Sequence, residues 1–271
     1  MIPVGFAYER PDAVEGALEL LAEHGEDATV LAGGHSLLPV MKLRLGTPEL
    51  IIDIGRLSEL SYVRVEGDEV AIGAGTRHHA VETSDVVAAE VPLLAAVART
   101  VGDPQVRHRG TLGGSLAHAD PASDLPAAVL ALGGTVVLRS LRGDRCVPIT
   151  AFYTGVFSSV REPDELVVEV RVPRTGGAGW AYEKFTRRAN DWAIVGVAVV
   201  DGRVGLVNMG STPLRASATE AALAEGASIV DAAMLADRDT DPPADVAGTK
   251  EYRRHLARVF ARRALTTAIV A

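Results

Sequence analysis

The chain has 271 residues, of which 48% are hydrophobic and 23% charged, so it can bury the core of one large domain or of two modest ones. Its formal net charge of -8 argues against a nucleic-acid partner, whose phosphates require a basic surface. Cys146 is the only cysteine, which excludes an internal disulfide and an iron–sulfur cluster held by several cysteines of this chain. The longest apolar stretches, such as residues 193–200, fall far short of the roughly 20 residues that cross a bilayer. Because the N-terminus also lacks a signal segment, we expect a cytoplasmic protein that does not span a membrane.

The first 55 residues carry the pattern of a small α/β unit. An extended segment at 6–8 precedes a helix that Pro11-Asp12 opens and Gly25 closes, and residues 28–31 then form a short apolar strand. A pair of glycines, an apolar helix that runs to Leu45 and a second strand at 50–54 follow. This order predicts a strand–helix–strand unit with a glycine turn after its first strand.

Residues 56–175 predict a larger mixed lobe. A hairpin is indicated at 62–73, where Gly67-Asp68 separates two strand patterns. Residues 102–124 are rich in Gly, Pro and Asp and show little regular pattern, and a stretch of that length inside a compact domain is usually functional. The remaining predicted elements are helices at 77–84, 92–101 and 125–132 and strands at 135–140 and 165–172.

A second domain is predicted after Thr175-Gly176-Gly177-Ala178-Gly179, which has the composition of a linker. Strand patterns at 180–185, 193–200 and 203–209 indicate an antiparallel meander in which Asp201-Gly202 forms a tight turn. Helices are predicted at 216–225 and 250–271, with an acidic loop at 237–245 between them.

Two glycine loops carry the clearest chemical signal. The first is Ala32-Gly33-Gly34-His35-Ser36, which lies between a strand and a helix and continues into Leu37-Leu38-Pro39. Paired glycines let the backbone turn sharply and approach a ligand, and the amides at the start of a helix attract phosphate. The spacing matches neither the P-loop nor the three-glycine dinucleotide fingerprint. Taken alone, this loop is better explained as a plain tight turn.

The second loop is Thr111-Leu112-Gly113-Gly114-Ser115, and the segment Asp120-Pro121-Ala122-Ser123-Asp124 follows it. It repeats the chemistry of the first loop, with two glycines, hydroxyl groups and an acidic residue near the start of a helix. Asp124 can also be simply the N-cap of that helix. Two such loops in one chain suit a single long ligand with two ends.

The two loops together resemble those of the FAD-binding medium subunits of molybdenum hydroxylases, the family of aerobic carbon monoxide dehydrogenase and xanthine dehydrogenase. Three later segments, Glu183-Lys184-Phe185, Arg187-Arg188 and residues 191–198, are also similar to that family, so the resemblance covers nearly the whole chain. It implies an α+β fold whose two-lobed FAD-binding domain, of the PCMH or vanillyl-alcohol-oxidase type, spans residues 1–175. Its lobes would cover about 1–55 and 56–175, and a C-terminal domain with an antiparallel sheet and helices would cover 177–271.

The resemblance also implies which residues contact FAD. The first loop would grip the pyrophosphate, the second would lie along the cofactor, Asp124 would lie near the adenosine portion, and Lys184 would approach the flavin ring. A lysine there would favour the reduced anion, although a solvated strand lysine is the alternative. Trp192 could cover an aromatic ring, but a core or interface tryptophan is the commoner case. The implied contacts are Ala32, Gly33, Gly34, His35, Ser36, Leu37, Leu38, Pro39, Thr111, Gly114, Ser115, Asp124 and Lys184.

By the same resemblance the chain is an oxidoreductase subunit that receives electrons from the iron–sulfur clusters of a small partner subunit and passes them to an external acceptor such as a quinone, NAD or oxygen. A molybdopterin large subunit would oxidise the substrate, and the assembly would be a dimer of heterotrimers. No Ser–His–acid set, close carboxylate pair or metal-ligand spacing is found in the sequence. Two alternatives remain open, a stand-alone FAD-dependent reductase or oxidase and a scaffold subunit that has lost FAD.

Overall fold

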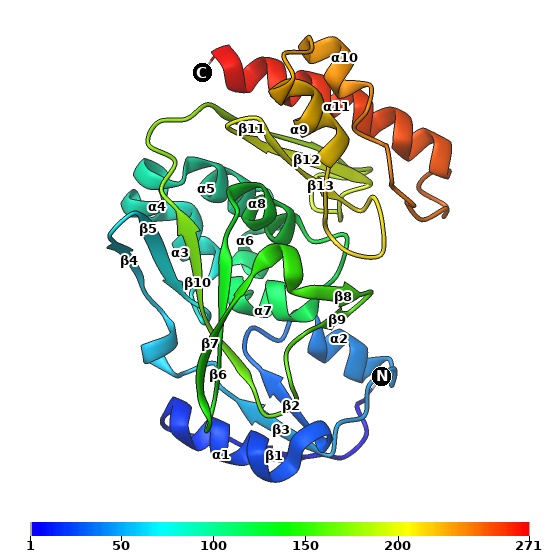
Figure 1. The fold of residues 1–271 in the computed structure, drawn as a ribbon. Coiled ribbons are helices and arrows are strands. Elements are labelled where there is room, and N and C mark those ends of the chain that lie inside the picture. Colours follow the sequence, from blue (N-terminus) through cyan, green and yellow to red (C-terminus); the bar gives the residue numbers. More distant parts are fainter. Residues whose placement is uncertain (1, 271) are drawn as a thin grey trace.

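The computed structural model describes residues 2–270; Met1, at the start of the predicted FAD-binding domain, and Ala271, at the end of the predicted last helix, lie outside the described residues. Figure 1 shows three parts stacked one above the other: an N-terminal α/β lobe, a mixed lobe around a long sheet, and a C-terminal sheet covered by helices. Among residues 2–270 no helix is both long and apolar enough to cross a membrane.

The N-terminal lobe is a three-stranded parallel sheet with two helices. Helix α1 buries Val14, Ala17, Leu18 and Leu21, which recur at the helical period, and it ends at Gly25 with a φ of 52° that favours glycine. The strand order is β1-β3-β2, so β2 is an edge strand. The elements are β1 (Ala7–Glu9), α1 (Val14–His24), β2 (Ala28–Leu31), α2 (Leu37–Lys42) and β3 (Leu50–Asp53).

The second lobe is built on a five-stranded antiparallel sheet of order β4-β5-β10-β6-β7. Its strands are β4 (Val63–Glu66), β5 (Glu69–Gly73), β6 (Thr135–Ser140), β7 (Gly143–Pro148) and β10 (Leu166–Pro173), with a short hairpin of β8 (Tyr153–Gly155) and β9 (Ser158–Ser159) beside them. Its helices are α3 (His78–Thr83), α4 (Asp85–Glu90), α5 (Pro92–Arg99), α6 (Pro104–Arg107), α7 (Leu112–His118) and α8 (Asp124–Leu132).

Alternating residues place this sheet between two cores. In β10, Val170 and Val172 pack against the helices of the same lobe, whereas Leu166 and Val168 pack against α1 and the N-terminal lobe. A strand buried on both faces needs apolar side chains at successive positions, which is the pattern of β10.

The stretch 102–124, predicted to lack regular structure, contains the helices α6 and α7, so that expectation is wrong. Helix α7 holds Gly113 and Gly114, which weaken the helical signal in the sequence. Hydrogen bonds to the segment after β5 stabilise the start of this helix despite its two glycines. The amides of Leu112 and Gly113 donate to the carbonyls of Thr76 and Ala74.

The C-terminal part is a four-stranded sheet of order β11-β12-β13-β14 with α11 across its outer face, as Figure 1 shows. In β12, Val195, Val197 and Val199 face α11, while Ala198 and Val200 face the second lobe. Asp201-Gly202 forms the predicted tight turn, with φ values of 48° and 71°. The elements are β11 (Trp180–Phe185), β12 (Val195–Val200), β13 (Arg203–Val207), β14 (Leu214–Arg215), α9 (Ser217–Ala224), α10 (Ile229–Ala233) and α11 (Lys250–Val270).

Candidate cofactor site

One cavity of about 530 Å³ is lined by residues from all three parts of the fold. That volume is typical of sites for small molecules and cofactors. The lining includes both glycine loops, the edge strand β2, the start of β10, and the strand and loop of the C-terminal part that carry Lys184 and Trp192. The cavity therefore depends on the whole chain and not on one lobe.

The structure packs the first glycine loop against Arg109 and Gly110, which lead directly into the second glycine loop. A Cβ atom on Gly33 would lie 2.5 Å from the carbonyl oxygen of Arg109 and 2.9 Å from the Cα of Gly110. Gly34 has a φ of 79°, in the left-handed region that favours glycine. The first glycine thus lets the two backbones pack together, and the second makes the turn.

A short segment after β5 holds the second loop in place. The amide of His78 donates to the carbonyl of Gly110 at 3.0 Å, and Arg77 and Thr111 form an antiparallel bridge. The Arg77 guanidinium donates to the carbonyl of Arg109 and, at 3.0 Å, to that of Gly55 after β3. Arg77 thereby ties the second loop to the N-terminal lobe.

His78 lies in the wall of the cavity and is buried, with 5% of its surface exposed. Its Nδ1 atom has no hydrogen-bond partner among the described residues. Burial lowers the pKa of His78 to about 4, and the charges of His35, Arg77 and Arg107 add to the effect. The imidazole is therefore neutral at physiological pH.

Asp124 and Lys184 form a buried ion pair, with 2.7 Å between Nζ and Oδ2. Tyr182 donates its hydroxyl hydrogen to the other carboxylate oxygen, and Lys184 also donates to the carbonyl of Thr100 at 3.0 Å. Burial raises the pKa of Asp124, while Lys184 and Tyr182 oppose that shift. The pair joins α8 of the second lobe to β11 of the C-terminal part.

This pair corrects the interpretation of Asp124 as an N-cap and bears on the contacts expected for Asp124 and Lys184. Asp124 was considered as an N-cap, but Ser123 occupies the N-cap position, and the Asp124 side chain bonds to Tyr182 and Lys184. Asp124 and Lys184 were expected at the adenosine and the flavin ring, which lie apart in an extended FAD. The two side chains touch, so both lie at the same place in the cavity, and the part of FAD that each contacts stays a prediction.

Most of the residues predicted to contact the cofactor line the cavity. Leu38 and Pro39 do not; they lie in the first turn of α2, where the Leu38 side chain packs beside Gly34. The Thr111 hydroxyl accepts the amide of Gly114 at 3.1 Å, so it caps α7 in addition to facing the cavity. The predicted residues that do line it are Ala32, Gly33, Gly34, His35, Ser36, Leu37, Thr111, Gly114, Ser115, Asp124 and Lys184.

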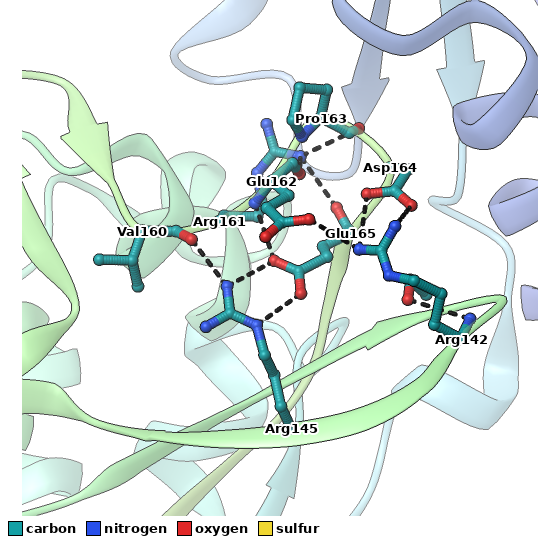
Figure 2. Close-up of polar contacts among 9 residues, drawn as sticks. Arg142, Arg145, Val160, Arg161, Glu162, Pro163, Asp164 and Glu165 are labelled. Atoms are coloured by element: carbon teal, nitrogen blue, oxygen red, sulfur yellow. Dashed lines mark hydrogen bonds and ion pairs between the residues drawn. The ribbon is translucent and has the colours of Figure 1, made fainter.

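Sequence reasoning missed several lining residues. No sequence pattern marks His78 as a cavity residue, and Arg161 and Glu165 lie in a charged turn of a kind that is usually solvated. Figure 2 shows this turn, into which Arg142 and Arg145 reach from the β6–β7 hairpin. Trp192 also lines the cavity although 61% of its surface is exposed. Among residues 2–270 no cluster of three or more His, Cys, Asp or Glu side chains is placed to hold a metal ion.

The cavity follows a continuous path. Strand β2 runs directly into the first glycine loop, this loop packs against the residues that lead into the second, and α7 leads to Asp124 and Lys184. Glycines that leave no room for a Cβ atom, an unpartnered buried histidine and polar groups at separate points suit a long ligand with a polar middle. The fold and the site therefore suit a long cofactor with a polar middle that lies along this cavity.

Comparison with known families identifies the class of protein. Residues 4–175 match the model described as the FAD binding domain in molybdopterin dehydrogenase, and residues 180–268 match the CO dehydrogenase flavoprotein C-terminal domain. The chain therefore belongs to the family of FAD-binding medium subunits of molybdenum hydroxylases, and FAD is its cofactor.

Individual relatives match over almost their full length. The carbon monoxide dehydrogenase medium chain of Hydrogenophaga pseudoflava is 42% identical, over 99% of this chain and 98% of the relative. The 6-hydroxypseudooxynicotine dehydrogenase complex subunit alpha of Paenarthrobacter nicotinovorans is 38% identical, over 99% and 96%. Among solved structures, a carbon monoxide dehydrogenase of H. pseudoflava that lacks the Mo-pyranopterin moiety superposes with a TM-score of 0.96, at 43% identity and over 100% and 99% of the two chains.

Proposed function

We propose that this chain receives electrons from the iron–sulfur clusters of a small partner subunit and passes them to an external acceptor, a quinone, NAD or oxygen. A molybdopterin large subunit would oxidise the substrate, and the complex would be a cytoplasmic dimer of heterotrimers. The bound flavin supplies chemistry that accepts electrons singly and donates them singly or in pairs. The chain itself has a single cysteine, so the clusters must come from a partner.

The observation that carries this proposal is the convergence of both glycine loops and Lys184 on one cavity. The loops would hold the pyrophosphate through their backbone amides, with Ser36 and Ser115 adding hydroxyl groups. Lys184 and Asp124 would lie together near the flavin ring. Because the carboxylate already balances the lysine, the pair would orient the ring with little net charge.

The substrate of the parent enzyme is not selected by this chain, since the molybdenum centre would lie in another subunit. Relatives of similar identity carry names that refer to carbon monoxide, glyceraldehyde, caffeine and a nicotine derivative. We therefore propose a substrate class that includes carbon monoxide, aldehydes, purines and N-heterocycles.

A purification in the native host tests the proposal. An affinity-tagged chain should copurify with a cysteine-rich small chain and a large chain that contains molybdopterin. Adding the correct substrate to this complex without an acceptor should bleach the flavin absorbance. Efficient substrate turnover by the isolated, FAD-loaded chain would favour the stand-alone enzyme instead. A complex in which substrate reduces the clusters but never the flavin would contradict the proposed electron path.

A further inference from the structure

Part of the cavity wall lies beside β2, and we call it the β2 end. Its wall is mainly apolar but includes two charged side chains, Arg161 and Glu165. Its apolar residues Leu21, Ala28, Val30, Ile54 and Leu166 share the core of the N-terminal lobe, Thr29 and Val167 also belong to this wall, and Arg161 is held there by its hydrogen bond to the Glu165 carbonyl. Because β2 is an edge strand and pairs only with β3 among the described strands, its other edge offers unpaired amide and carbonyl groups.

Arg161 has an unusual set of contacts for a residue in a charged turn. Its Nη1 atom donates to the carbonyls of Glu162 and Glu165, both at 2.9 Å, and to that of Pro163 at 3.4 Å. It forms no ion pair among the described residues, although three carboxylates lie in the same turn. Its guanidinium is therefore held by backbone groups, and its charge is not neutralised by a carboxylate at contact distance.

The neighbouring carboxylates are engaged by other arginines. Both oxygens of Glu165 accept hydrogen bonds from Arg145, at 2.6 and 2.7 Å, and one also accepts the amide of Glu162. Asp164 and Glu162 pair with Arg142. Figure 2 shows these pairs bracing the turn from the side of the β6–β7 hairpin. The turn is thus fixed in a way that leaves Arg161 available to the cavity.

We propose that Arg161 lies against the adenine ring of FAD and makes the β2 end selective for the dinucleotide over FMN, an inference that rests on the proposed function. A planar guanidinium stacks well on an aromatic ring and is more weakly hydrated than an ammonium group. Adenine presents a donor and an acceptor side by side, which complement an amide and a carbonyl on the free edge of β2. Apolar residues such as Leu21 and Val167 complete the wall.

The alternative partner for a cavity arginine is a phosphate. The glycine loops would already supply backbone amides for the pyrophosphate, and Arg161 bonds to the carbonyl of Glu165, directly before the apolar start of β10. An aromatic, uncharged group therefore suits its surroundings better than an anion does. The two partners predict different behaviour toward ligands that have a phosphate but no adenine.

Binding of FAD, FMN and ADP to the flavin-depleted full-length chain, with any partner subunits that copurify, distinguishes these cases. In Arg161→Met the dissociation constants for FAD and ADP should rise by tenfold or more, while that for FMN should stay within about twofold of wild type. Arg161→Lys should recover only part of the loss, because it keeps the charge but not the planar group. Arg139→Met is the matched control and should bind all three ligands as the wild type does, since Arg139 pairs with Asp144 within the β6–β7 hairpin and neither residue lines the cavity.

Three results would overturn the inference. Unchanged FAD and ADP binding in Arg161→Met would show that the ring does not lie there. Equal weakening for all three ligands, or full recovery in Arg161→Lys, would point to a structural or phosphate-binding role. If the wild-type protein binds none of the three ligands, the proposed function fails and this inference falls with it.

Discussion

Gly33 packs against the backbone that leads into the second loop, because its missing side chain leaves room for the carbonyl of Arg109. We predict that Gly33→Ala forces the loops apart, destabilises the fold by about 1–3 kcal/mol and weakens FAD binding by roughly tenfold or more. Fluorescence titration with FAD and urea unfolding measure the two effects. Gly5→Ala is the control, because a Cβ atom there meets nothing within 4 Å. Equal behaviour of the two variants would contradict the role of Gly33.

His78 makes stability depend on pH. Its pKa is about 4 in the folded chain against 6.5 for a free histidine, so below pH 6.5 the unfolded chain binds a proton that the folded chain does not. The free energy of unfolding is therefore highest near pH 7 with respect to His78 and falls as the pH drops from 6.5 toward 4. We expect it to be about 2 kcal/mol lower at pH 5 than at pH 7. Urea unfolding at pH 7 and pH 5 measures it.

Replacing His78 isolates this contribution. The change in unfolding free energy between pH 7 and pH 5 should shrink by about 2 kcal/mol in His78→Gln. The exposed His24 provides a control variant, His24→Gln, which should keep the wild-type dependence. A pH dependence that is the same in wild type and His78→Gln would show that His78 is not the group responsible.

Among the helices, α7 is stabilised at its N-terminus by a side-chain cap. Thr111 is 3% exposed and its hydroxyl caps the amide of Gly114, so Thr111→Val leaves that donor without its partner. We predict a loss of about 1 kcal/mol in unfolding free energy for Thr111→Val. Thr111→Ser keeps the hydroxyl and should be closer to wild type. If the valine variant is as stable as the serine variant, the cap does not stabilise α7.

Elements with a strong hydrophobic pattern can be predicted from the sequence, whereas elements with a weak pattern cannot. The continuous apolar run of β12 and the amphipathic helix α1 follow directly from their sequences. Strand β7 was missed because it is an exposed edge strand with charged residues, and its pairing with β6 fixes it from outside. Helix α7 was missed for a similar reason, since contacts with the segment after β5 offset its two glycines.

At the scale of the whole molecule, the Asp124–Lys184 pair connects the second lobe to the C-terminal part. Removing one partner leaves a buried charge without compensation, so Asp124→Asn and Lys184→Met should each cost about 3 kcal/mol or more. The double variant should cost less than the sum of the two, with a coupling of at least about 1 kcal/mol. Urea unfolding of the four proteins gives this cycle. Additive costs would show that the two side chains do not stabilise each other.

Only the parts of the candidate site that lie within short sequence motifs could be predicted from the sequence. Both glycine loops and Lys184 were predicted, because each lies in a local pattern. The contact between Gly33 and Arg109, the pairing of Asp124 with Lys184 and the position of Arg161 depend on residues far apart in the chain. No local pattern encodes such distances, so these features required the folded structure.

We propose that one cavity, formed by all three parts of the chain, holds FAD. The most direct test is to purify the chain with its copurifying subunits, record the visible spectrum and identify the flavin released on denaturation. We expect flavin absorbance and the release of FAD in an amount stoichiometric with this chain. A complex that contains no flavin and takes up none when FAD is added would contradict this proposal.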